Sequence, residues 1–197
     1  MIKVGCLILT VSLLIPAAQA SSVVQVTFTE LVSSSEFIFE GRVIDKRAEL
    51  DSRGMIHTYV TFEVRDVLKG TYSGRTLVLP YLGGTVGEIT LHISDLQPPD
   101  TGEKGIYFVE SISRPPVHPL YGWDQGHFLV LTDATDRLEH VFSRNRKPVV
   151  GFESRPGKAT GLSTGVATGL LLADPNRSNQ AVTVYDFRQK IRELLPR

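Results

Sequence analysis

The chain has 197 residues, and its 21 Lys and Arg residues balance its 21 Asp and Glu residues. A formal charge of zero provides no long-range field for nucleic acid or an anionic membrane surface, so we expect neither as a partner. A single cysteine excludes a disulfide framework, and the stability of the fold must come from a hydrophobic core. The length is sufficient for one such core.

The first twenty residues have the layout of a secretory signal peptide. Lys3 gives a positive start, residues 4–15 form an apolar run, Pro16 interrupts it, and Ala18 to Ala20 offer a small-x-small cleavage site. The apolar run has about a dozen residues, too few to cross a hydrocarbon layer of about 30 Å. We therefore expect cleavage after Ala20, loss of the one cysteine, no membrane span in the mature chain, and a periplasmic or secreted protein.

The mature chain is predicted to begin with a short helix followed by a β-hairpin. Thr27 and Glu30 have the spacing of a capping box, which predicts the start of the helix. Residues 37–46 and 57–68 alternate apolar and polar side chains and predict the two arms of the hairpin. Asp51 to Gly54 supply turn residues between the arms.

Further strands are predicted at 76–81, 88–93, 105–112, 127–131 and 140–142. Ile89, Leu91 and Ile93 alternate with polar residues and should face the core. Pro80 indicates that the end of its strand lies on a sheet edge. Short, evenly spaced strands without intervening helices predict that residues 21–144 form a mainly β domain, a small closed or partly closed barrel of five to six strands. A β-sandwich is the alternative architecture.

The last quarter of the chain is divided into two segments by its composition. Residues 145–182 are rich in glycine and proline with little periodicity, which predicts a flexible segment. Residues 183–197 are predicted to form a C-terminal amphipathic helix that docks on the barrel. Thr183 and Asp186 have the spacing of a helix cap, and Val184, Phe187 and Ile191 share one face.

The sequence contains no convincing catalytic, metal or cofactor motif, and we expect none of these sites. Gly161 to Gly165 match the G-x-S-x-G pattern of a nucleophile elbow, which requires a serine between a buried strand and a helix. The proline and glycine of residues 156–157 precede it instead, and a flexible loop is the better interpretation. The histidines lack metal-ligand spacing; they are His57, His92, His118, His127 and His140.

The most distinctive short stretch runs from Tyr121 to His127. It contains the only tryptophan of the chain, Trp123, between two glycines and beside a proline-rich connection. An aromatic side chain in such a loop can anchor a ligand or partner, and Trp123, Asp124 and His127 are our candidate binding residues. The alternative is that Trp123 closes one end of the barrel as part of its core.

Residues 28–44, 56–70 and Gly83-Gly84 together resemble a known pattern. It is similar to exported bacterial proteins related to the N-terminal domain of the tissue inhibitors of metalloproteinases, and the similarity covers residues 23–131. The resemblance implies a netrin-like, OB-like barrel with flanking helices. In these inhibitors the mature N-terminus places its free amino group and carbonyl on the protease zinc. The matching positions here are Ser21, Ser22 and Val23, without the cysteines that hold that ridge in the inhibitors.

Three functions follow from these observations. The leading hypothesis is an exported, non-enzymatic binding module that recognises a protein or an envelope component through the barrel loops and the Trp123 region. The second is inhibition of an extracellular metalloprotease by the processed N-terminus at Ser21 and Ser22. The third and weakest is an enzyme whose site is assembled from distant loops. Clustering of His92, His118 or His127 with a carboxylate in a pocket would favour this third hypothesis.

Overall fold

The computed structural model describes residues 23–94, 96–113, 117–155 and 157–195. The predicted signal peptide and the candidate residues Ser21 and Ser22 lie outside the described residues. The fold is mainly β, with two α-helices. No helix in the described part of the chain is both long and apolar enough to span a membrane.

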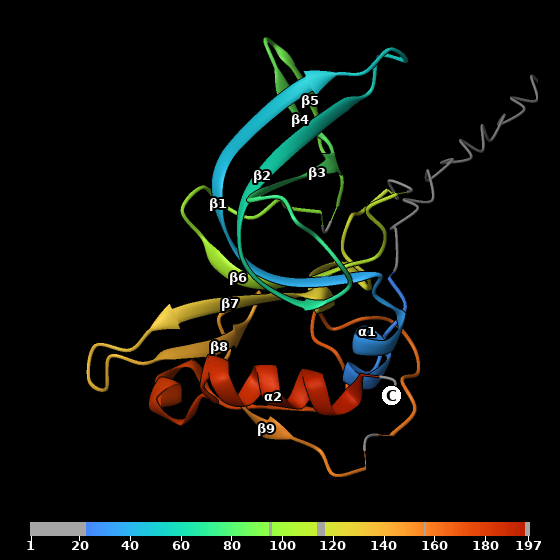
Figure 1. The fold of residues 1–197 in the computed structure, drawn as a ribbon. Helices are drawn as coiled ribbons and strands as arrows, with labels where there is room; N and C mark the ends of the chain where they lie inside the picture. Colours follow the sequence, from blue (N-terminus) through green and yellow to red (C-terminus); the bar gives the residue numbers. More distant parts are fainter. Residues whose placement is uncertain (1–22, 95, 114–116, 156, 196–197) are drawn as a thin grey trace, which may run out of the picture.

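The elements follow one another from the N-terminal helix to the C-terminal helix (Figure 1). They are α1 (Phe28–Ser34), β1 (Phe37–Leu50), β2 (Ile56–Lys69), β3 (Thr76–Leu82), β4 (Gly84–Val86), β5 (Ile89–Leu91), β6 (Lys104–Val109), the 3-10 helix η1 (Trp123–Gly126), β7 (His127–Thr132), β8 (Glu139–Ser143), β9 (Val149–Phe152), β10 (Leu170–Leu172), the 3-10 helix η2 (Pro175–Gln180) and α2 (Val184–Leu194).

Six strands form one antiparallel sheet in the order β3-β2-β1-β6-β7-β8. The predicted hairpin is its central feature, with β1 and β2 paired from Ile38 opposite Lys69 to Leu50 opposite Ile56. β3, which carries Pro80, is an edge strand, as the proline indicated. β3 and β8 are the two edges of the sheet and are not paired with each other, so the sheet is curved but not closed into a barrel.

The curvature of β1 has a local cause in its pairing with β2. The register shifts at three places along β1, and such bulges bend a strand and increase its twist. Gly41 lies at one of the shifts. A Cβ atom there would lie 2.7 Å from the Glu63 carbonyl oxygen and 2.8 Å from the ring of Phe39, so the close crossing requires glycine.

The sheet buries both of its faces where β1 and β6 run side by side. Successive side chains of a strand point to opposite faces, so Phe37 and Phe39 enter one core while Ile38 enters another. The first core lies inside the curve of the sheet and includes Tyr107. The second lies between the outer face and the helices, where Phe187 of α2 packs among the aromatic rings of α1 and the sheet.

Both predicted helices are present with their predicted caps. The Glu30 amide donates to the Thr27 hydroxyl at 3.0 Å, and the reciprocal bond completes the capping box of α1. The Asp186 amide donates to the Thr183 hydroxyl at 3.1 Å at the start of α2. α2 lies across the sheet next to β7 and β8, and its C-terminal end reaches α1 (Figure 1).

Two segments differ from the expectations drawn from the sequence. Residues 145–182, expected to be flexible, contain the antiparallel pair β9 and β10, and Val149, Ala167 and Leu170 are buried. Ile89, expected to face the core, is 61% exposed, because β5 pairs only with the short β4 in a separate two-stranded ribbon.

Candidate functional site

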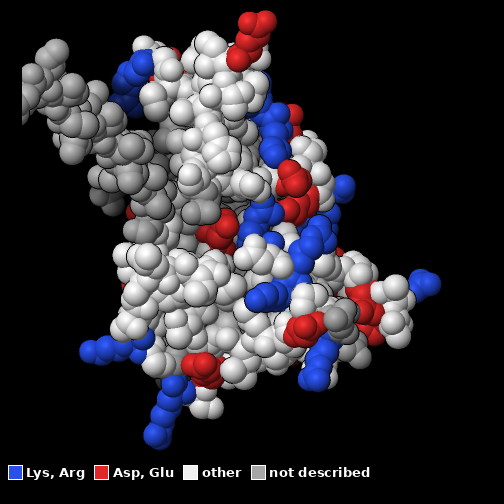
Figure 2. Space-filling view, turned by 180° about the vertical axis from the view of Figure 1, so that it is seen from behind, with Lys and Arg blue, Asp and Glu red and all other residues white. Residues whose placement is uncertain are grey.

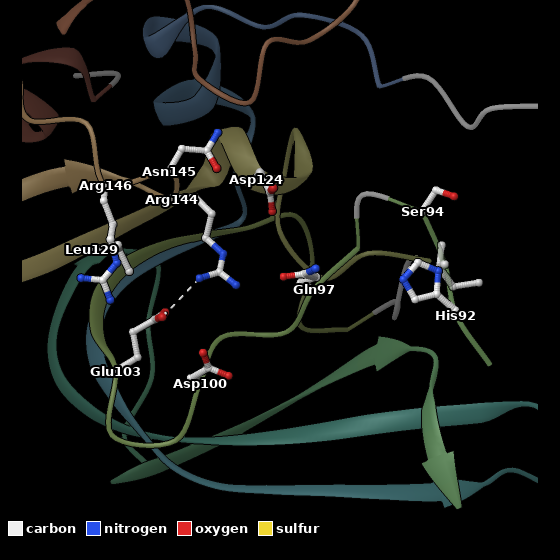
Figure 3. A pocket seen from close by; sticks show the side chains of 11 residues that line it. His92, Ser94, Gln97, Asp100, Glu103, Asp124, Leu129, Arg144, Asn145 and Arg146 are labelled. Carbon is white, nitrogen blue, oxygen red and sulfur yellow. Dashed lines mark hydrogen bonds and ion pairs between the residues drawn. The ribbon is translucent and has the colours of Figure 1, made fainter. Parts of the chain in front are cut away.

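A groove of about 630 Å³ lies beside the inner core and is lined almost entirely by polar side chains (Figure 3). This is within the size range of small-molecule sites in proteins. We call it the polar groove. Its lining residues are His92, Ile93, Ser94, Gln97, Asp100, Glu103, Asp124, Leu129, Arg144, Asn145 and Arg146. Acidic and basic side chains also lie next to one another along one edge of the molecule in the view from behind (Figure 2).

Glu103 and Arg144 form the floor of the polar groove, and the buried His127 lies beneath them as the third member of a charged cluster. Arg144 Nη1 donates to Glu103 Oε2 at 3.3 Å, and both side chains are about 15% exposed (Figure 3). On its other side, Glu103 Oε1 lies 2.7 Å from Nε2 of the buried His127, without the alignment of a hydrogen bond. Burial lowers the pKa of His127, and the Glu103 carboxylate only partly opposes this effect.

The ends of three strands bring this cluster together. Glu103 directly precedes β6, and its carbonyl accepts the Val43 amide of β1 at 2.9 Å. His127 is the first residue of β7 and is paired with Tyr107 of β6. Arg144 directly follows β8, at the turn that leads into β9. The site therefore depends on the register of the sheet, since each side chain is positioned by a different strand.

A second group of rings, around Trp123 and His118, lies next to the cluster. The two rings are stacked, with centroids 5.2 Å apart and an angle of 13° between their planes. His118 Nδ1 accepts the Leu120 amide at 3.1 Å, which leaves the proton of the neutral ring on Nε2. Burial lowers the pKa of His118 to about 3. Trp123 has a φ of 60°, a left-handed conformation that large side chains rarely adopt.

Five buried polar atoms of this region have no hydrogen-bond partner among the described residues. They are the hydroxyls of Tyr81 and Tyr107, Nε2 of His118 and His127, and Oε1 of Glu103, and we call them the unpaired set. The rings connect them, since Tyr81 lies 5.3 Å from His118 and Tyr107 lies 4.9 Å from His127 between centroids. Burial raises the pKa of both tyrosines, which keeps their hydroxyls protonated. An unpaired buried polar atom is costly and calls for a ligand or water.

Three of the candidate residues from the sequence meet at this site. Asp124 lines the polar groove, His127 lies beneath its floor, and Trp123 is stacked on the neighbouring His118. Trp123 is half-buried and packs on the inner core. Glu103, Arg144 and His118 were not singled out as binding residues from the sequence, because nothing in their local patterns shows that they converge.

The chemistry of the arrangement favours binding. In the described ranges, no group of three or more His, Cys, Asp or Glu side chains is placed to hold a metal ion. A histidine does meet a carboxylate, but His127 is only 2% exposed and is covered by the Glu103–Arg144 pair. His92, which lines the groove, is exposed. The groove thus offers hydrogen-bonding groups to a ligand, and His127 lies behind them, next to Glu103.

The segment that follows the predicted cleavage site is fixed next to this region. The Ser163 amide donates to the Val23 carbonyl at 2.7 Å, and the Gln25 amide donates to the Gly161 carbonyl at 3.1 Å. Gln125 of η1 accepts the Val26 amide and donates to the Val24 carbonyl, at 2.9 and 3.0 Å. The segment thus has hydrogen-bond partners both in η1 and in the loop that contains the G-x-S-x-G pattern.

The chain matches no protein-family model, and comparison with curated proteins and with solved structures found no match either.

Proposed function

We propose that this protein is an exported, non-enzymatic binding module that takes part of a protein or envelope component into the polar groove. The single observation that carries this proposal is the groove itself, in which acidic, basic and amide side chains of distant segments surround an open space. In a concave ligand site, convergent polar groups fix the orientation of the ligand and provide specificity.

We extend this proposal to a partly closed OB-like, netrin-like barrel as the scaffold, located in the periplasm or outside the cell. The strongly curved hairpin, the internal core and the two helices on the outer face support the scaffold. The signal-peptide pattern of residues 1–20 supports the location.

Affinity capture from the native envelope tests the binding function. The mature chain should retain a specific component, and Arg146→Ala, which changes an exposed groove residue, should reduce its recovery about tenfold. Trp123→Ala tests whether the adjacent aromatic residue takes part in binding. Arg155→Ala, an exposed arginine outside the lining residues, is the matched control and should retain the wild-type yield. Equal recovery with all variants, or turnover abolished by one polar substitution, would overturn the proposal.

A second candidate function is inhibition of an extracellular metalloprotease through the amino group and carbonyl of Ser21. The specific observation is the fixed position of Val23 to Val26, whose hydrogen bonds would replace the disulfides of the inhibitors. A fixed segment loses less entropy on binding and so keeps more affinity. Addition of one residue before Ser21 should abolish inhibition of a zinc protease, and unchanged inhibition would exclude this mechanism.

A further inference from the structure

The charges of the polar groove are largely compensated within the protein. Asp100 pairs with Lys46 at 3.2 Å, and Glu103 pairs with Arg144 at 3.3 Å. Asp124 faces the same space as Arg144 and Arg146 (Figure 3). A charged ligand group would have to compete with these internal pairs and to leave part of its own charge without a counterion. The groove therefore suits an uncharged ligand.

The lining also disfavours a peptide side chain as the occupant. Among the lining residues only Ile93 and Leu129 are apolar, and both are accompanied by amide, carboxylate and guanidinium groups. Protein interfaces depend on apolar or aromatic anchors that fill desolvated pockets, and this groove offers little surface for such an anchor. Planar amide and carboxylate groups instead present paired donors and acceptors, which match neighbouring hydroxyl groups on a ring.

The unpaired set lies close to the Glu103–Arg144 pair, whose charges act on both tyrosine hydroxyls. The tyrosine hydroxyls and the protonated Nε2 of His118 are donors without acceptors, whereas Glu103 Oε1 lies 2.7 Å from His127 Nε2 in a contact without hydrogen-bond geometry. Glu103 and Arg144 line the groove, whereas Tyr107 and His127 are almost completely buried, so a ligand reaches the unpaired set only if Arg144 moves. A hydroxyl group, which both donates and accepts, could then pair with several of them.

We propose that the polar groove binds an uncharged, hydroxyl-rich saccharide, one hydroxyl of which reaches the Glu103–His127 contact and Tyr107 when Arg144 moves. This inference rests on the proposed binding function and specifies its ligand as the glycan part of an envelope component. The groove volume of about 630 Å³ accommodates two to three sugar rings, roughly the scale of a short glycan segment.

Titration calorimetry on the mature protein tests the ligand class with three probes of three sugar rings each. The N-acetylglucosamine trisaccharide is uncharged, the glucosamine trisaccharide is cationic, and the galacturonic acid trisaccharide is anionic. The uncharged probe should bind at least about tenfold more tightly than either charged probe. Trp123, the only tryptophan, provides a second signal through its fluorescence. No binding of the uncharged probe at about 10 mM, or equal binding of a charged probe, would overturn the proposal.

Two substitutions locate the binding site of the uncharged probe. Asn145→Ala removes an exposed amide of the groove wall, and Tyr107→Phe removes one hydroxyl of the unpaired set; each should weaken binding about tenfold. Tyr185→Phe, 67% exposed on α2, is the matched control and should bind as the wild type does. If Tyr107→Phe changes only thermal stability while binding is retained, the unpaired set is served by internal water and the proposal fails. Envelope capture that depends on Arg146 without saccharide binding would refute this ligand while leaving the binding function standing.

Discussion

At the residue scale, Gly41 and Gly105 decide whether the strands can cross as closely as they do. Gly105 lies in β6 beneath the ring of Tyr107, and a Cβ atom there would lie 2.6 Å from the Phe128 carbonyl oxygen and 2.9 Å from the Tyr107 ring. Neither the β7 backbone nor the buried ring can yield easily. The lack of a side chain at Gly105 thus allows Tyr107 to pack against His127.

Gly105→Ala should therefore destabilise the protein by about 1–3 kcal/mol through overpacking. Urea unfolding followed by Trp123 fluorescence measures the change in the free energy of unfolding. Gly157→Ala is the control, because nothing lies within 4 Å of a Cβ atom at that position. An unchanged unfolding midpoint for Gly105→Ala would contradict the close packing of β6 and β7.

His118 should make the protein sensitive to acid. Burial lowers its pKa from 6.5 to about 3, whereas the unfolded chain takes up the proton near the ordinary value. Between these pH values unfolding binds a proton, so the contribution of His118 is fully present above about pH 6.5 and is lost as the pH falls. His118→Asn should flatten the dependence of the unfolding free energy on pH, between pH 6 and 4, by up to about 1.4 kcal/mol per pH unit.

The measurement is a series of urea titrations at several pH values, with the exposed His92→Asn as the matched control. An equal slope of the unfolding free energy against pH in wild type and His118→Asn would show that the folded protein protonates His118 without cost.

The residues of the candidate site differ in how far the sequence could indicate them. Trp123, Asp124 and His127 stand out because an aromatic residue between two glycines is locally unusual. Glu103 and Arg144 look like ordinary residues at strand ends, and 41 positions separate them. Only the pairing of β1, β6, β7 and β8 brings them together, and that pairing is a property of the whole sheet.

At the scale of elements, α2 is attached to the sheet by charge as well as by packing. Glu40 points from β1 toward the helix, and its side chain is only 3% exposed. Its carboxylate pairs with Arg188 of α2 and with Lys104 of β6, the latter at 3.3 Å. Arg188 also reaches Asp66 of β2 at 3.4 Å, so one helix residue connects two strands.

Glu40→Gln should lower the free energy of unfolding by about 2–3 kcal/mol, because two cations of a buried network lose their shared counterion. Chemical denaturation monitored by circular dichroism gives this value. The control is Glu63→Gln, which removes an exposed partner of Arg65 and should change stability by at most about 0.5 kcal/mol. A similar change in the free energy of unfolding for Glu40→Gln and Glu63→Gln would mean that the Glu40 network adds little to helix docking.

The elements themselves were predictable where their signals are local. Alternation along 57–68 and the caps at Thr27 and Thr183 identify β2, α1 and α2. β9 and β10 were missed because strands of four and three residues are too short for a periodic pattern, and their pairing spans the glycine-rich loop. The prediction for Ile89 was wrong because alternation shows that a strand has two faces but not whether the rest of the fold covers either face.

At the scale of the whole molecule, the two cores share the same pair of strands. Because β1 and β6 contribute side chains to both faces, the inner core with its polar groove and the outer core with its helices should unfold together. Phe187 connects the helix to this unit, since its ring lies 4.9 Å from that of Phe128 and 5.2 Å from that of Phe28.

Phe187→Ala should destabilise the entire protein by about 3–5 kcal/mol, with a single transition in both Trp123 fluorescence and far-UV circular dichroism. Tyr185→Ala on the exposed face of the same helix is the control and should have little effect. If the far-UV circular dichroism signal is instead lost before the Trp123 fluorescence changes, α2 unfolds separately and the two cores are independent.

The bonds between residues 23–28 and residues 161–168 also determine the order in which the fold can be completed. Their donors and acceptors are more than 130 positions apart in the chain, so they form only after nearly the whole polypeptide is available. If the chain is exported from its N-terminus, as we propose, residues 23–28 would remain without these partners until residues 161–168 had crossed. In that case Val23 to Phe28 would be among the last segments to be fixed, and closure of the fold would wait for the end of the chain.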